Sequence, residues 1–251
     1  QVNSIAAIYE DKNFLALYKP AGILVHPLKT KNYKLKTNEP TLVDWLIKNY
    51  PEVKKVGDPS TSSGQVNLRP GIVHRLDKDT SGVILVARNQ KYFEYLKTLF
   101  QNRQIKKTYL ALVWGKLTPK VGVIKKPILV KSGSVKRTVW QGRMEKEAIT
   151  EYKVKKYFQS FNKFRIDPER SRMGQDFSWV EVYPKTGRTH QIRVHLASIG
   201  HPVVGDRLYC PKKDVDLKRH FLHAESLEFS SPNGERLKLG VDLPEDLQNF
   251  L

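Results

Sequence analysis

Cysteine is almost absent from this chain of 251 residues, in which Cys210 is the only one. A single cysteine excludes an internal disulfide and any metal or iron–sulfur cage built from the cysteines of one chain, and it is typical of a reducing compartment. The chain also lacks any run near the ~18 apolar residues that a membrane span requires. Its start, QVNSIAAIYEDKNF, has no basic flank followed by an apolar core. We therefore expect a cytoplasmic protein without membrane contact.

Motifs for nucleotide cofactors and metal ions are missing as well. Neither GxxxxGKS/T nor GxGxxG occurs, so neither ATP nor a dinucleotide is implied. Five histidines lie at positions 190, 195, 201, 220 and 223, but no HExxH pattern supports them. His190 and His195 are also five residues apart, whereas two ligands on one helix face need a spacing of four. We expect no metal site and no cofactor.

Positive charge is what the chain has in excess. Forty-four Lys and Arg stand against 25 Asp and Glu, which gives a formal net charge of +19. An excess of this size favours a polyanionic partner such as RNA, although a generally basic surface would also explain it. A hydrophobic content of 39% suits a buried core.

Short apolar segments alternate with turn signals and with three segments whose apolar residues recur at helical spacing. They predict strands at 5–10, 14–18, 82–87, 108–114, 147–157 and 177–183, and helices after Thr41, at 89–102 and at 188–199. The Lys-rich stretch 28–40 and the stretch 58–65 read as a solvated loop and a spacer. We expect an α+β fold, with a mixed, largely antiparallel central sheet and flanking helices and loops. It forms one domain, 1–251, in which no N-terminal RNA-binding module is visible.

Two polar clusters are candidates for chemistry. Residues 69–88, RPGIVHRLDKDTSGVILVAR, place Asp77 directly before a buried strand, where a rigid neighbour can hold a catalytic group. The alternative is a turn in which Asp77, Asp79 and Ser81 act as caps or form Asx turns before Gly82. In KTGRTHQIRVHL, Arg193 lies between two apolar residues. It is either a surface cation or a partly buried arginine that needs a carboxylate partner.

Four stretches in the right order resemble the RluA-type pseudouridine synthases. YEDKNFLALYKPAGILVHP (9–27) is similar to the first motif of that family, and RPGIVHRLDKDTSGVILVAR (69–88) to its second. KKTYLALVWG (106–115) resembles the strand that carries the active-site tyrosine, and PKTGRTHQIRVHLASIGHPVVGDRLY (184–209) resembles the third motif. The resemblance implies an enzyme that isomerises uridine to pseudouridine in structured RNA without a cofactor.

The resemblance also implies catalytic roles. Asp77 corresponds to the catalytic carboxylate, which attacks the sugar or stabilises the charge that develops at its anomeric carbon. Arg193 corresponds to the cation that keeps this carboxylate ionised. Tyr109 offers a face for stacking on uracil and a hydroxyl for proton transfer, the alternative being a core aromatic of a strand.

Further residues are implied in RNA binding. Because a stacked uridine must be extruded before it reacts, a wedge is expected, and Arg75 corresponds to it. His74 assists there or packs in the core. Lys19 either stabilises the active-site loop or meets phosphate. Arg188, His190 and Gln191 stand where a helix N-terminus would bind phosphate, and Lys136 and Arg137 extend the basic track, together with Arg143.

Two rival functions remain from the residues alone. One is a noncatalytic RNA-binding or ribosome assembly protein, in which Asp77 would be dispensable. The other is a nucleic-acid glycosylase, which would release free uracil instead of rejoining it. By resemblance, large-subunit ribosomal RNA is the leading substrate and transfer RNA the second, and a monomer is the simplest assembly.

Overall fold

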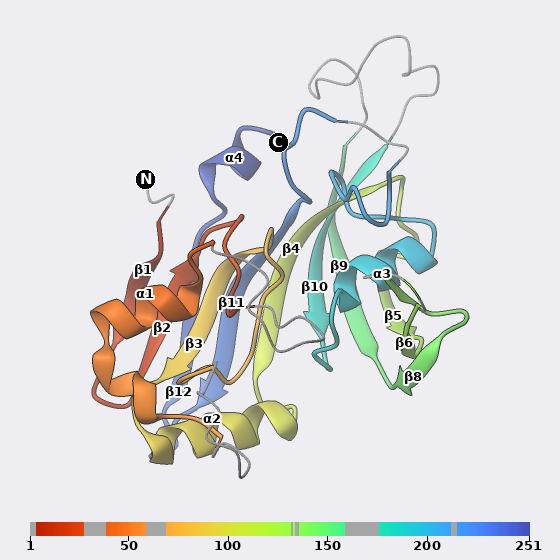
Figure 1. Ribbon diagram of the computed structural model, residues 1–251. Coiled ribbons are helices and arrows are strands. Elements are labelled where there is room, and N and C mark those ends of the chain that lie inside the picture. Colours follow the sequence, from red (N-terminus) through yellow and green to blue (C-terminus); the bar gives the residue numbers. More distant parts are fainter. Residues whose placement is uncertain are drawn as a thin grey trace. The chain divides into compact units, whose positions relative to one another are not determined.

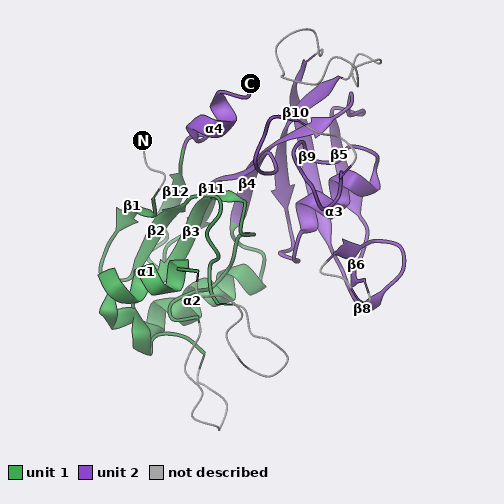
Figure 2. Cartoon of the chain, turned by 45° about the horizontal axis from the view of Figure 1, so that its top comes forward, with its two compact units in different colours: residues 1–105, 226–241 green, residues 106–225, 242–251 purple. Residues whose placement is uncertain are grey.

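The computed structural model describes residues 4–27, 39–58, 69–131, 133, 136–158, 176–211 and 215–251. Most of the stretches 28–40 and 58–65 therefore lies outside the described residues. The chain divides into two compact units (Figure 2). Unit 1 comprises residues 1–105 and 226–241, and unit 2 comprises residues 106–225 and 242–251. That both units act as one catalytic domain stays a prediction.

Unit 1 contains the hairpin and the buried strand that the sequence predicts (Figure 1). Its elements are β1 (Ala6–Glu10), β2 (Phe14–Lys19), α1 (Leu42–Asn49), the 3-10 helix η1 (Pro51–Lys55), β3 (Ser81–Ala87), α2 (Gln90–Gln101) and β12 (Arg236–Gly240). Strand β11 (Leu222–Ser230) begins in unit 2 and ends in unit 1. The pairs β1–β2, β2–β3 and β11–β12 are antiparallel.

The central strands of unit 1 are buried on both faces because successive side chains point to opposite sides of a sheet. Ile84 and Val86 of β3 pack in one cluster with Leu42 and Leu46 of α1. The intervening side chains of β3 pack on the other face with Phe93 and Leu96 of α2. Both helices begin at side-chain caps: Thr41 forms a capping box with Asp44, and Asn89 accepts a hydrogen bond from the amide of Tyr92.

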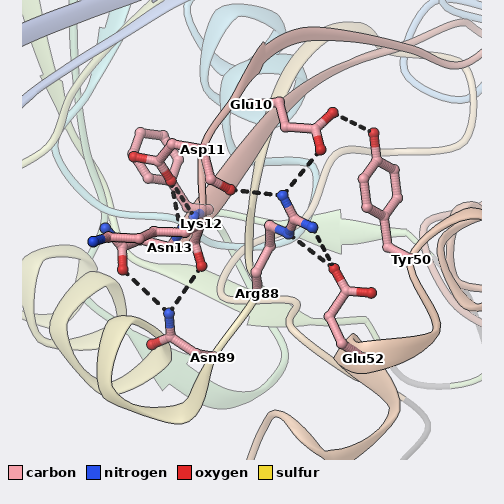
Figure 3. Close-up of polar contacts among 9 residues, drawn as sticks. Glu10, Asp11, Lys12, Asn13, Tyr50, Glu52, Arg88 and Asn89 are labelled. Carbon is pink, nitrogen blue, oxygen red and sulfur yellow. Dashed lines mark hydrogen bonds and ion pairs between the residues drawn. The ribbon is translucent and has the colours of Figure 1, made fainter.

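Arg88, directly after β3, anchors this strand to its surroundings (Figure 3). Its Nε donates to Glu52 at 2.9 Å, and its Nη1 donates to Glu10 at 2.9 Å and to the carbonyl of Asp11 at 2.7 Å. Tyr50 donates its hydroxyl to the same Glu10 and lies under the guanidinium. Arg88 ends the second motif, and these contacts make it a structural residue that ties β3 to the β1–β2 hairpin and to η1.

Unit 2 contains the other half of the strands. Each strand pairs antiparallel with the next in the order β4 (Lys106–Trp114), β10 (Phe177–Pro184), β9 (Ile149–Phe158) and β5 (Val121–Lys125). A separate small sheet has the order β7 (Arg137–Thr138), β6 (Ile128–Val130), β8 (Arg143–Lys146). The helices are α3 (Gln191–Ser198) and α4 (Glu245–Gln248). The sequence did not predict the small sheet, because strands of two to four residues carry too short a pattern.

The sequence predicted that this helix begins at Arg188, but α3 begins at Gln191. The reason is His190, whose φ of 57° lies in the left-handed region and cannot continue a right-handed helix. Ile192 and Leu196 pack into the main core of unit 2. On another face, Val194 packs with Ile128 of the small sheet. Helix α3 therefore connects the main sheet of unit 2 to the small sheet.

The predicted α+β class is confirmed. Every strand pairing given above is antiparallel, and each unit contains helices as well as strands. Within the described residues, none of the helices has the length and apolar character needed to cross a membrane.

Candidate active site

Asp77 lies in a loop, residues 69–80, that leads directly into β3, as the sequence predicts. The loop is fixed at its start by Gly71, whose φ is +69° and where a Cβ would lie only 2.5 Å from the carbonyl oxygen of Ala87. Leu76 is buried, while Asp77 itself is half-buried. The amide of Thr80 donates to the carbonyl of Asp77 at 3.2 Å and closes a turn around it. The carboxylate therefore stands on a short turn between two buried residues.

Lys19, at the end of β2, stabilises this turn through its buried side chain. Its side chain is fully buried, and its ammonium donates to the carbonyls of Pro20 at 2.7 Å, Ile23 at 2.9 Å and Lys78 at 2.9 Å. The amide of Gly22 donates to the same Lys78 carbonyl at 2.9 Å. Three acceptors match the three N–H groups of an ammonium. Lys19 thus fastens the loop of the first motif to the residue that follows Asp77.

His74 is the second internal support of the loop. Its Nε2 accepts a hydrogen bond from the amide of Leu85 in β3 at 2.8 Å, and its ring stacks on Phe100 of α2 at 4.4 Å between centroids. Since Nε2 is an acceptor here, the neutral ring carries its proton on Nδ1. Both contacts join the loop to elements of unit 1, one to β3 and the other to α2.

Arg75 projects from the loop as an exposed cation beside a buried histidine. Its Nη1 lies 3.5 Å from Nε2 of His26. Nδ1 of His26 lies 3.0 Å from the carbonyl of Pro27, to which it donates. Burial lowers the pKa of His26, and the nearby charges of Arg69 and Arg75 act in the same direction. A neutral His26 therefore presents an acceptor to the Arg75 guanidinium.

Arg193 in α3 is buried, and it has the carboxylate partner that its burial requires. Its Nε donates to Asp206 at 2.6 Å and its Nη2 donates to the other carboxylate oxygen at 2.8 Å. Burial alone would raise the pKa of Asp206, but the hydrogen bonds and the charge of Arg193 outweigh it and lower this pKa. Sequence reasoning missed Asp206, although it lies within the third motif and a buried arginine calls for a carboxylate.

Tyr109 lies in β4, opposite Val182 of β10. It is half-buried and packs against the main core of unit 2. Asp77 belongs to unit 1, whereas Tyr109 and Arg193 belong to unit 2. The meeting of these three residues therefore stays a prediction.

The loop before α3 is held by the side-chain amide of Gln191, a buried residue. Its Oε1 accepts from the hydroxyl of Thr186 at 2.7 Å and from the amide of Arg188 at 3.0 Å. Its Nε2 donates to the carbonyl of Ile149 and to the hydroxyl of Thr150, both at 3.0 Å. Two acceptor and two donor positions are thus used inside the protein. A direct contact of this amide with RNA would break bonds that shape the loop.

The side chains of Arg188 and His190 lie at the surface of the same loop and are half-buried. Nε of Arg188 donates to the carbonyl of Glu147 at 3.0 Å. His190 precedes the helix without a side-chain capping bond. The helix N-terminus that the sequence placed at Arg188 is therefore formed three residues later, after His190.

The small sheet presents cations and one exposed aromatic residue. Lys136 and Arg137 are half-buried, and Arg143 is exposed. Trp140, which the sequence analysis did not select, is 74% exposed, and the ammonium of Lys126 lies 5.0 Å from its ring centre. An exposed tryptophan among cations is a pattern that binds unpaired bases in nucleic acids. The signal was available in KRTVWQGR, where Trp140 stands between basic residues.

No group of three or more His, Cys, Asp and Glu side chains placed to hold a metal ion occurs in the part of the chain that the structure describes. Histidines 190 and 195 have other partners: His190 contacts Tyr209, and His195 bonds to Thr150 and to the carbonyl of Lys126.

Comparisons with known proteins agree on one family. The family model described as RNA pseudouridylate synthase matches residues 13–198. The "Uncharacterized RNA pseudouridine synthase YlyB" of Bacillus subtilis (strain 168) is 34% identical over 244 residues, which are 97% of this chain and 70% of YlyB. The "Ribosomal large subunit pseudouridine synthase D" of Borreliella burgdorferi is 32% identical over 249 residues, which are 98% of this chain and 68% of that protein.

A solved structure is similar over almost the whole chain. It is that of "Human RNA Pseudouridylate Synthase Domain Containing 1", with a TM-score of 0.69 and 25% sequence identity. The match covers 97% of this chain and 85% of the human one.

Proposed function

Since the chain belongs to the RNA pseudouridylate synthase family and is an RNA pseudouridine synthase, we propose that it modifies large-subunit ribosomal RNA with Asp77 as its catalytic carboxylate. In this reaction the bond between N1 of uracil and C1′ of ribose breaks, and a bond between C5 and C1′ forms. C5 loses its proton to solvent and N1 gains one, so the electrons balance without a cofactor. Relatives named for the ribosomal large subunit support this target, and transfer RNA is the second choice.

The support of the Asp77 turn is the observation that carries the catalytic assignment. A carboxylate that attacks C1′, or stabilises positive charge there, must be held in place during the reaction. Lys19 and Gly22 both bind the carbonyl of Lys78, the residue next to Asp77. Because Lys19 has this internal role, we assign it to positioning the turn and not to phosphate binding.

Arg193 is proposed to keep Asp77 ionised. The two bonds from Arg193 to Asp206 use Nε and Nη2, so Asp206 fixes the plane of the guanidinium. A guanidinium shared by two carboxylates can orient one of them while the other holds the cation. Asp206 would then set the direction of Arg193, and Arg193 the charge and direction of Asp77.

Tyr109 and Arg75 are proposed to bind the extruded uridine and to fill the place that it leaves in the RNA stack. Arg75 is exposed on the same loop as Asp77, and a guanidinium plane can replace lost base stacking while its charge meets phosphate. Tyr109 would stack on the uracil ring. We assign His74 to holding the loop, because both of its described contacts are internal.

RNA outside the reacting uridine is proposed to follow the cations of unit 2. These are Arg188, Lys136 and Arg137, with the His190 imidazole beside them as a hydrogen-bonding group and Trp140 as a stacking platform. Gln191 serves this surface indirectly, through the four hydrogen bonds that shape the loop. The monomeric state and the cytoplasmic location stay predictions.

Tritium release tests the proposed function. We expect the protein to release tritium to water from large-subunit ribosomal RNA transcribed with uridine tritiated at C5, and Asp77→Asn to abolish release with RNA affinity retained. The matched control is Asp79→Asn, which removes the same charge from an exposed position of the same loop and keeps turnover. Binding without release from ribosomal or transfer RNA would support a noncatalytic RNA-binding protein. Free uracil among the products would support a glycosylase.

A further inference from the structure

Tyr209 connects three parts of unit 2 that the proposed function uses separately. It lies after α3, in the segment that contains Asp206, and its ring is partly buried against Ile128, Ala148 and Val194. Its contacts reach β7 of the small sheet, His190 before α3 and Arg193 within α3. Packing alone would account for an aromatic ring here, but not for the contacts of its hydroxyl.

The hydroxyl of Tyr209 joins β7 to the loop before α3. It accepts a hydrogen bond from the amide of Arg137 at 2.8 Å, and it lies 3.0 Å from Nδ1 of His190. A backbone amide can only donate, so the hydroxyl oxygen is the acceptor in the first bond. Its own proton can then be donated to Nδ1 of His190, which places the proton of a neutral imidazole on Nε2.

His190 needs such a tertiary contact. Its φ of 57° is uncommon for a residue with a side chain and costs conformational energy, so the surroundings must hold it there. The ring of Tyr209 also meets the His190 ring edge-on, with centroids 5.8 Å apart. The direction of the imidazole is therefore set by Tyr209 through both its hydroxyl and its ring.

The ring of Tyr209 also covers the guanidinium of Arg193, with Cζ of Arg193 5.3 Å from the ring centre. The amide of Tyr209 donates to Oδ1 of Asp206 at 3.1 Å, and Asp206 in turn holds Arg193 at two nitrogens. Arg193 is thus held by a carboxylate and an aromatic face that come from one short segment of the chain.

We propose that Tyr209 is a positioning residue that couples RNA binding at β7 to the orientation of Arg193, an inference that rests on the proposed function. The hydroxyl carries the RNA-binding part, since it fixes the Arg137 backbone and the His190 side chain relative to each other. The ring carries the catalytic part, since it fixes the plane of the Arg193 guanidinium. Phenylalanine and leucine at this position separate the two parts.

Steady-state tritium release and RNA affinity are measured for wild type, Tyr209→Phe and Tyr209→Leu on the same C5-tritiated large-subunit ribosomal RNA. For Tyr209→Phe we expect KM and the RNA dissociation constant to rise about three- to tenfold, with kcat changed less than twofold. For Tyr209→Leu we expect the same rise and, in addition, a roughly tenfold lower kcat, because the guanidinium loses its aromatic face.

The matched control is Tyr95→Phe, which removes a hydroxyl that donates to the carbonyl of Ser230 at 2.8 Å in unit 1. It should leave KM, kcat and RNA affinity as in wild type. Melting temperatures of all variants check folding, and Tyr209→Phe retains the packing of the ring. An RNA affinity of Tyr209→Phe equal to that of wild type would overturn the role of the hydroxyl. Equal kcat values for Tyr209→Phe and Tyr209→Leu would overturn the role of the ring.

Failure of the proposed function gives a different result. If wild-type protein binds the RNA but releases no tritium, the proposed function and the catalytic part of this inference are both refuted. The dissociation constants of wild type and Tyr209→Phe still decide the part of the hydroxyl, because that comparison needs no turnover.

Discussion

Replacing Asp206 by asparagine removes one charge from a buried ion pair and little else. Asparagine has nearly the same shape, and its amide oxygen can still accept the bonds that Oδ1 of Asp206 receives from the amides of Leu208 and Tyr209. The Nδ2 group, however, would take the place of Oδ2 and face the Nε–H donor of Arg193. The substitution therefore removes the carboxylate charge that holds the buried Arg193 cation at two nitrogens.

The expected loss of stability is large. Breaking a buried pair by removing one partner costs about 3–5 kcal/mol, because the remaining charge stays desolvated. That is a substantial part of the roughly 5–15 kcal/mol by which a domain is stable. At about 2–4 °C per kcal/mol for a chain of this size, the melting temperature should fall by roughly 6–20 °C.

The assay is urea unfolding of four proteins: wild type, Asp206→Asn, Arg193→Met and the double variant. Each single variant leaves one buried charge, whereas the double variant leaves none. We therefore expect the double variant to be more stable than the sum of the single losses implies, by at least about 2 kcal/mol. The slope of free energy against urea should stay unchanged, since the folded state is the same.

The pH dependence adds a second check. Because the pKa of Asp206 is lowered in the folded state, its contribution is complete above the ordinary carboxyl pKa of about 4 and is lost as the pH falls through the lowered value. The stability gap between wild type and Asp206→Asn should shrink in that acidic range only. A loss below about 1 kcal/mol at neutral pH, or strictly additive single losses, would refute the reasoning.

Three further perturbations have expected outcomes. Lys19→Met removes the ammonium from three carbonyls, so we expect unfolding in urea to need about 3 kcal/mol less and turnover to fall more than RNA affinity; unchanged stability would contradict the contacts of Lys19. Trp140→Ala should weaken RNA binding by about 1–3 kcal/mol in fluorescence anisotropy, whereas Val123→Ala, which alters another exposed apolar residue of unit 2, should not. Burial lowers the pKa of His195 in the folded state. Its contribution to the free energy of unfolding should therefore be fully present above about pH 6.5 and be lost as the pH falls through the lowered value. In His195→Gln this decline should be smaller, and an identical slope of unfolding free energy against pH would argue against a neutral, buried His195.

The sequence by itself determined the elements whose causes are local. A continuous apolar run predicted β3 as a strand buried on both faces, and Thr41 predicted the start of α1 through a bond that spans three residues. Apolar residues at helical intervals in 89–102 predicted α2. The four motifs identified the family, and the net charge of +19 indicated a polyanionic partner. Both kinds of information are readable without coordinates, because each depends on near neighbours or on composition.

Only the tertiary structure decided which distant groups share a contact. Lys19 meets the carbonyl of Lys78 across 59 positions, and the amide of Arg137 meets the hydroxyl of Tyr209 across 72. Asp206 pairs with Arg193 over 13 positions, and the conformation of His190 delays the start of α3. No periodicity records such pairs, since they arise when strands and loops far apart in the chain are brought together by burial of the cores.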